Sequence, residues 1–230
     1  TPLASVLVNR LTGSRTIITR KMQTPPSLTY EQKLKLDDLA ERLIASEEPV
    51  TILIDGHEAE ISEYLIKKLP NARVVMDGGS LRASNIKLAA WTDYFVVSEH
   101  FARDYMSYRS LSTEAEIKAA LIELNKICRG EAFITLGEKG CAFLKSGMLQ
   151  IVPSWLCNAV DTTGAGDVFH GAFTYGVHYS WHIDNIILFA SLTAAISIEK
   201  KGVRESMPDL AVVHHSLNSY ERNLTQYFEE

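Results

Sequence analysis

One short segment holds the residues best suited to chemistry. Residues 160–171 have the sequence Val-Asp-Thr-Thr-Gly-Ala-Gly-Asp-Val-Phe-His-Gly, and a helical pattern follows over 166–180. Small residues at Gly164, Ala165 and Gly166 allow backbone N–H groups to converge, and the helix N-terminus adds the positive end of its dipole. The turn is therefore suited to bind a phosphoryl group while it is transferred. Asp167 falls in the first turn, where its carboxylate could take a proton from an attacking hydroxyl.

Two common nucleotide-binding patterns do not fit the chain. The dinucleotide fingerprint needs a further glycine three positions after Gly166, whereas the next glycine is Gly171. No GxxxxGK[ST] motif occurs, so any nucleotide is bound without a Walker loop. A purely structural alternative stays open for the segment itself, because Asp161 and Asp167 could cap a helix while the glycines allow close packing.

The elements that must position this segment alternate between strands and helices. Short apolar runs, three of which end in Asp-Gly, Asp-Gly-Gly or Leu-Gly, predict buried strands, and apolar residues at helical spacing predict amphipathic helices. We expect strands at 50–56, 73–79, 94–98, 132–137, 140–144 and 149–152, and helices at 30–46, 58–69, 82–90, 99–107, 113–128, 166–180, 185–200 and 208–229. This order predicts a three-layer α/β fold with a mostly parallel central sheet and helices on both faces. Ligands of such sheets bind at the carboxyl ends of the strands.

The N-terminal part has a different character. Residues 5–20 contain two β-rich runs on either side of Thr12-Gly13-Ser14, which is a hairpin signal. The stretch Thr24-Pro25-Pro26-Ser27 then breaks the chain. We therefore expect a β hairpin within residues 1–29 and an α/β body over 30–230.

Length and composition narrow the class of protein. The chain has 230 residues, 46% of them hydrophobic, and a net charge of −5, which is typical of a globular α/β protein and a poor match for nucleic-acid binding. No apolar run approaches the roughly 18 to 20 residues that span a bilayer, so no membrane partner is expected. Three cysteines without a CxxC motif favour reduced thiols in a cytoplasmic protein.

Three motifs together carry a family resemblance. Asp-Thr-Thr-Gly-Ala-Gly-Asp at 161–167 resembles the C-terminal signature of the ribokinase-like (PfkB) carbohydrate kinases. Thr-Leu-Gly-Glu-Lys-Gly at 135–140 resembles the nucleotide-side element upstream of that signature, and residues 201–206 resemble the later Gly-x-x-x-Ser loop. The resemblance covers roughly residues 5–210. It implies ATP and Mg²⁺ as cofactors, K⁺ as a further cofactor candidate, and a small-molecule sugar as substrate.

The same resemblance assigns roles to individual residues. It makes Asp167 the catalytic base and Gly164, Ala165 and Gly166 the anion hole. The resemblance also implies nucleotide contacts at Thr135, Gly137, Gly140, Ser191, Ala194 and Ala195. It implies a monovalent-cation loop formed by Asp161, Thr163, Ser197, Lys200, Gly202 and Ser206. Asp55, His57 and Asp77 end strands near the expected cleft. His57 is a candidate substrate or phosphate contact, with a turn-capping role as its alternative.

Two departures from the family pattern stand out. Many members have Asn-x-x-Glu after the strand at 94–98, where it organises Mg²⁺ and phosphate, whereas this chain has Ser98-Glu99-His100-Phe101. The family's sugar-recognising residues lie mostly before the hairpin, and nothing here precedes Thr1. We therefore expect these 230 residues to be a portion of a longer kinase of about 300 residues.

The hairpin resembles the ketohexokinase branch, in which it belongs to a β-sheet lid that closes over the sugar and can pair with a second subunit. A homodimer through this lid is therefore an expectation. The function implied is an ATP-dependent carbohydrate kinase that transfers the γ-phosphoryl group to a sugar hydroxyl. The alternatives are a non-catalytic nucleotide- or sugar-binding protein with a kinase fold, and a nucleoside kinase on the same fold.

Overall fold

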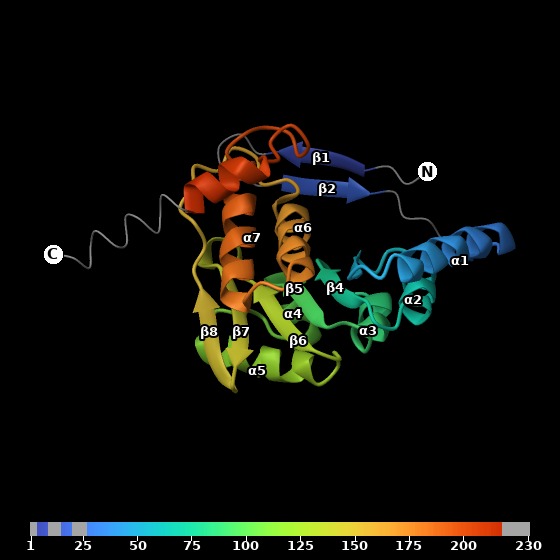
Figure 1. Cartoon of the computed structure of the whole chain (residues 1–230). Coiled ribbons are helices and arrows are strands. Elements are labelled where there is room, and N and C mark those ends of the chain that lie inside the picture. Colours follow the sequence, from blue (N-terminus) through green and yellow to red (C-terminus); the bar gives the residue numbers. More distant parts are fainter. Residues whose placement is uncertain (1–3, 9–14, 20–26, 218–230) are drawn as a thin grey trace.

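The computed structural model describes residues 4–8, 15–19 and 27–217 (Figure 1). At the N-terminus β1 (Ala4–Val8) pairs antiparallel with β2 (Arg15–Thr19), with Ala4 opposite Thr19 and Val8 opposite Arg15. The strand pairing of the predicted hairpin is present, and its turn, residues 9–14, lies outside the described residues. In Figure 1 this pair lies on the side of the molecule toward which β4 and β6 point.

The body is built on a six-stranded sheet in the order β3-β4-β5-β6-β7-β8. The strands β3 to β6 are parallel, and β7 and β8 are each antiparallel to the strand before them. Their bounds are β3 (Thr51–Ile54), β4 (Arg73–Gly78), β5 (Tyr94–Ser98), β6 (Glu131–Thr135), β7 (Cys141–Lys145) and β8 (Met148–Val152). The mostly parallel sheet expected from the sequence is confirmed.

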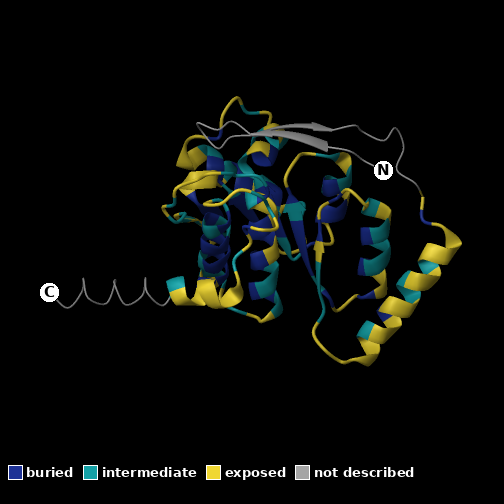
Figure 2. Ribbon diagram, turned by 90° about the horizontal axis from the view of Figure 1, so that it is seen from above, coloured by how far each residue is buried: buried dark blue, intermediate teal, exposed yellow. Residues whose placement is uncertain are grey.

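One face of the sheet is covered by the crossover helices. These are α2 (Ala59–Lys68), α3 (Ala83–Ala89), α4 (Glu99–Tyr105) and α5 (Glu114–Asn125). Alternate strand residues such as Val74, Met76 and Phe95 point into this layer and share a core with Phe101 and Leu121. Outside it, α1 (Tyr30–Ala45) begins at the capping box of Thr29 and Gln32 and presents a mostly exposed surface (Figure 2).

The other face is covered by α6 (Ala165–His178) and α7 (Ile183–Ser197), which pack against each other. The strand residues that point this way, including Val75, Val96 and Phe133, form a second core with Phe173 of α6. The rings of Phe133 and Phe173 meet edge to face with centroids 5.3 Å apart. Because aromatic pairs of this kind bury a large area, they fix α6 against the middle of the sheet.

The predicted helices and strands of the body are present with ends shifted by a few residues. After Thr135 the chain forms a 3₁₀ turn, η1 (Gly137–Lys139), before β7. The last predicted helix, 208–229, is helical over 210–217, and its remainder lies outside the described residues. Within the described residues, no helix has the length and apolar character needed to cross a membrane.

Candidate active site

Residues 160–171 enter α6 through a turn at Gly164, a position that only glycine fits. Gly164 caps the N-terminus of α6 with φ of +76°, a left-handed conformation that L side chains rarely adopt. A Cβ at this position would lie 2.5 Å from Cγ1 of Val203, so the turn and the 200–206 loop approach each other closely. The first hydrogen bond of α6 then runs from Val168 N–H to the Gly164 carbonyl at 2.9 Å.

Asp167 is exposed in the first turn of α6, and so is Gly166. N–H groups in the first turn of a helix have no preceding turn to supply acceptors, so they point outward and favour an anion. The Cβ position of Gly166 has no atom within 4 Å, which leaves its surroundings open. The structure therefore places an exposed carboxylate beside a helix N-terminus that can bind a negatively charged group.

Two carboxylates, Asp167 and Asp55, lie close enough to Asp77 to act on it electrostatically. Asp77 is in β4, and Asp55 follows β3 directly. Burial raises the pKa of Asp77 above its usual value; the charge of His170 opposes this rise, and the charges of Asp167 and Asp55 add to it. The carboxyl ends of β3 and β4 and the first turn of α6 thus form one acidic cluster.

His170 was not singled out by sequence reasoning, and the structure gives it a central place. Its side chain is buried, and Nδ1 lies 3.4 Å from Oδ2 of Asp77. The same Nδ1 lies 2.6 Å from the carbonyl oxygen of Gly166, and Nε2 lies 3.1 Å from the carbonyl oxygen of Val96 in β5. The signal available in the sequence was its position one helical turn after Gly166, on the buried side of α6.

The loops predicted to bind a monovalent cation come together. The backbone N–H groups of Val160 and Asp161 both donate to the carbonyl of Ile198, at 2.7 and 3.1 Å. The carboxylate of Asp161 accepts from Thr163 N–H at 3.0 Å and from Gly202 N–H at 3.3 Å. Two segments about 40 residues apart in sequence are therefore joined through one aspartate.

The other residues predicted for the monovalent-cation loop differ in burial and in their hydrogen bonds. The Ser197 hydroxyl donates to the Ala194 carbonyl within α7 at 2.7 Å, the Ser206 hydroxyl donates to the Val203 carbonyl at 3.4 Å, and Lys200 is exposed. The buried Oγ1 of Thr163 has no hydrogen-bond partner among the described residues. An orphaned hydroxyl oxygen next to the Asp161 carboxylate is the donor chemistry that a hard monovalent cation fits.

The nucleotide-side turn follows the end of β6. Thr135 is half-buried and its hydroxyl donates to the Val97 carbonyl at 3.4 Å, while Gly137 is exposed with φ of +61°. Gly140 has φ of +101°, and a Cβ there would lie 2.0 Å from the Val152 carbonyl oxygen. Gly140 therefore has a structural role in the close approach of this turn to the end of β8.

The three predicted nucleotide contacts on α7 lie in the C-terminal half of that helix. Ser191 and Ala195 are buried, and Ala194 is half-buried. The segment after β8 connects this helix with the β6 turn: Trp155 Nε1–H donates to the Leu188 carbonyl at 3.2 Å, and the Ser154 hydroxyl donates to the Glu138 carbonyl. The connection between the two groups of nucleotide candidates thus runs through residues 153–155.

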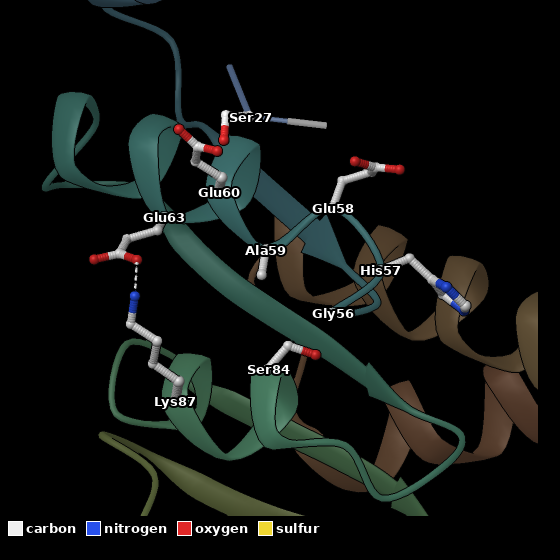
Figure 3. Close-up of a pocket in the computed structure, with 9 residues that line it drawn as sticks. All are labelled: Ser27, Gly56, His57, Glu58, Ala59, Glu60, Glu63, Ser84 and Lys87. Atoms are coloured by element: carbon white, nitrogen blue, oxygen red, sulfur yellow. Dashed lines mark hydrogen bonds and ion pairs between the residues drawn. The ribbon is translucent and has the colours of Figure 1, made fainter. Parts of the chain in front are cut away.

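His57 lies two residues after Asp55 in the sequence. It is exposed in the turn after β3, and its backbone N–H donates to Oδ1 of Asp55 at 2.9 Å. It lines a pocket of about 400 Å³ together with Gly56, with Ser84 and Lys87 of α3, and with residues of α2. Its ring points away from Ser84 and Lys87 in Figure 3. Asp167 is not among the residues that line this pocket.

Comparison with known proteins identifies the family. The sequence pattern of the pfkB family carbohydrate kinases matches residues 79–210. The chain therefore belongs to this family. A ribokinase of Lactococcus lactis subsp. lactis is 29% identical over 189 residues, which make up 82% of this chain and 60% of the relative. This chain thus spans about 60% of the length of that curated relative.

Solved structures share the fold. The ribokinase of Giardia lamblia superposes with a TM-score of 0.75 at 21% identity, over 96% of this chain and 72% of that one. The structure of Arabidopsis thaliana ribokinase complexed with ribose and ATP superposes with a TM-score of 0.70 at 21% identity, over 92% of this chain and 67% of that one. The described body thus has the ribokinase-like α/β fold that the motifs imply.

Proposed function

We propose that this chain carries the nucleotide-binding and catalytic part of an ATP-dependent sugar kinase. The observation that carries the proposal is the exposed carboxylate of Asp167 in the first turn of α6, directly after the Gly164 turn. In the proposed reaction a sugar hydroxyl gives its proton to Asp167 as its oxygen bonds to the γ-phosphorus. The bond from the γ-phosphorus to the bridging oxygen breaks, and ADP leaves.

The turn at the start of α6 supplies the electrostatic half of the mechanism. Backbone N–H groups of Gly166 and Asp167, in the first turn of α6, would donate to the oxygens of the phosphoryl group, and the helix dipole favours the negative charge there. Such a site needs no rearrangement during the reaction because the N–H groups are already held by the helix. Gly166 leaves open space beside this turn, because a Cβ there would meet no atom within 4 Å.

The nucleotide is proposed to lie between the β6 turn and α7. Thr135, Gly137 and Gly140 would contact its ribose and phosphates, and Ser191, Ala194 and Ala195 would border its base. Two observations support this site: the exposed left-handed Gly137 and the likeness of the fold to the Arabidopsis ribokinase that is complexed with ATP. Mg²⁺ would enter with ATP and shield its phosphate charges.

A monovalent cation such as K⁺ is proposed at the Asp161 loop. The residues that would hold it are Asp161 and Thr163, with carbonyl oxygens of the 197–206 loop near Gly202. When bound, it would add positive charge behind the anion-binding turn. The support is the orphaned buried Oγ1 of Thr163 and the two hydrogen bonds accepted by Asp161.

The β1–β2 pair is proposed as part of a lid, distinct from the body at residues 30–230, and as a surface for pairing with a second copy. Its support is its place in Figure 1, on the side where parallel strands end.

We propose a sugar of the pentose class as acceptor because the similar proteins are ribokinases. The ketohexokinase branch predicted from the hairpin stays a prediction, and so does a sugar contact by His57.

The test is the rate of ADP formation with ATP and a panel of ribose, deoxyribose and fructose, for the parent chain and for Asp167→Asn. The amide keeps the shape of the carboxylate but cannot accept the proton, so turnover should fall by about 10²- to 10⁴-fold. Asp184→Asn is the matched control, since Asp184 is also an aspartate in the first turn of a helix. Equal rates for parent and Asp167→Asn would refute the base assignment.

One alternative has a specific observation in its favour. The segment Ser98-Glu99-His100-Phe101 lacks the Asn-x-x-Glu pattern, and the Ser98 hydroxyl is occupied in donating to the Gly79 carbonyl at 2.9 Å and capping α4. A protein that binds nucleotide or sugar without transferring phosphate would be compatible with this. Calorimetry that shows ATP binding, combined with no ADP formation for any sugar, would favour the binding protein.

A further inference from the structure

The buried imidazole of His170 has a carbonyl oxygen at each ring nitrogen. Nδ1 lies 2.6 Å from the oxygen of Gly166, and Nε2 lies 3.1 Å from the oxygen of Val96. Gly166 is in the first turn of α6, and Val96 is in β5, 74 residues away from the histidine. The ring therefore bridges the catalytic turn and the central sheet.

Carbonyl oxygens only accept hydrogen bonds, so each ring nitrogen must donate. A neutral imidazole has one N–H, and in either tautomer the lone pair of the other nitrogen would face a carbonyl oxygen at 2.6 or 3.1 Å. Two facing lone pairs repel each other, and a buried polar group without a partner is costly. The imidazolium has two N–H groups and satisfies both carbonyls.

The surroundings supply the opposite charge that a buried cation needs. Oδ2 of Asp77 lies 3.4 Å from Nδ1, on the same side as the Gly166 carbonyl. Asp55 and Asp167 are close enough to act electrostatically on Asp77, so the cluster is negative before His170 is counted. An apolar side chain also borders the imidazole: the ring of Phe169 meets His170 edge to face, with centroids 5.9 Å apart.

We propose that His170 is a positioning residue that acts as a cation, with Asp77 as its counter-ion, and holds the first turn of α6 at a fixed place above β4 and β5. Its bond to the Gly166 carbonyl fixes the peptide that precedes Asp167. The base and the anion-binding N–H groups would then keep one orientation relative to each other. The catalytic consequence rests on the proposed function, whereas the charge state does not.

The charge state is tested on the full chain by nitrogen NMR of ¹⁵N-labelled histidine at neutral pH. The chain has seven histidines, so the His170 signals are assigned by their loss in His170→Gln. We expect both ring nitrogens to carry a proton, with both N–H protons visible because burial slows their exchange. An unprotonated ring nitrogen in native His170 would overturn the proposal, whether or not the chain phosphorylates any sugar. If His170→Gln does not fold, His100→Gln and the other single variants assign the signals by elimination.

The positioning role is tested by kinetics of His170→Gln and Asp77→Asn, with His100→Gln as the control because His100 is exposed on α4. A displaced base loses rate more than binding, so kcat should fall by about 10- to 100-fold while KM for ATP changes less than about 3-fold. His170→Lys, which restores the positive charge, should recover part of kcat. An unchanged kcat in a folded His170→Gln would show that His170 does not position the base.

Discussion

The carboxylate of Asp161 accepts a hydrogen bond from the backbone N–H of Gly202 at 3.3 Å, across 41 residues of sequence. Its other oxygen accepts from Thr163 N–H, two residues along the chain. One side chain thus shapes the start of the catalytic segment and attaches it to the loop after α7. The family signature and the later Gly-x-x-x-Ser loop are separate motifs in the sequence and one structure in the fold.

Asp161→Asn should weaken this connection. The amide is neutral and has one acceptor oxygen in place of two, so both N–H groups lose a charged acceptor and one of them has no acceptor left, at a cost of about 1.5–3 kcal/mol. We expect the K⁺ concentration for half-maximal activity to rise by about 10-fold or more. The measurement is ADP formation across a K⁺ series, with Asp38→Asn on the exposed face of α1 as control. An unchanged K⁺ dependence would argue against a cation at this loop.

Gly164→Ala should damage the anion-binding turn through both backbone strain and a clash of the new Cβ. Gly147→Ala is the variant that distinguishes these two effects. Both glycines have φ of +76°, so both variants carry the left-handed strain of about 1–2 kcal/mol. Only at Gly164 does the new Cβ meet Val203, whereas nothing lies within 4 Å at Gly147. Denaturant unfolding should show the larger loss for Gly164→Ala. Its turnover should also fall while that of Gly147→Ala stays near the parent rate, and similar losses in both would point to strain alone.

The three cysteines should differ sharply in reactivity. Burial raises the pKa of Cys128 to about 11 and that of Cys141 to about 12. Since the thiolate is the reactive form, raising the pKa lowers reactivity at pH 8. A thiol-specific disulfide reagent at pH 8 should modify Cys157 first, Cys128 slowly and Cys141 only after unfolding. Fast labelling of Cys141 in the native protein, followed in Cys157→Ser, would contradict its burial.

The capping box of α5 gives a prediction remote from the site. Thr113 accepts from Glu116 N–H at 3.2 Å, and the Glu116 side chain accepts from Thr113 N–H at 2.9 Å. Thr113→Ala should lower the free energy of unfolding by about 1 kcal/mol, because helix N–H groups lose their acceptor. Thr113→Ser keeps the hydroxyl and should stay close to the parent. Urea unfolding followed by circular dichroism measures both, and equal losses would mean that the hydroxyl contributes nothing.

The hairpin pairing and the alternation of strands and helices were predictable because they depend on local patterns. Runs such as 73–79 and 94–98 are apolar and bounded by turn residues, so they predict buried strands without knowledge of their neighbours. The Gly164 turn was likewise visible, since glycines before a helical pattern point to a tight turn. The ends of these elements shifted because the last residues of a helix or strand depend on tertiary contacts.

His170 shows what local patterns leave out. In the sequence it is one polar residue on an apolar helix face, and helical spacing places only Gly166, among its partners, near it. Its two carbonyl partners and Asp77 come from three different elements, and only the packing of α6 across β4 and β5 brings them to one ring. A histidine's hydrogen bonds depend on distant backbone atoms whose positions the sequence pattern does not give.

The sequence by itself determined the family motifs, the order of elements and the identity of the candidate base. Those follow from residue types at short range, where periodicity, turn preference and motif spacing act. Only the tertiary structure decided that the Asp161 and Gly202 loops meet and that Asp77 and His170 are paired. These relationships join residues far apart in the chain, and they arise from how the helices pack on the sheet.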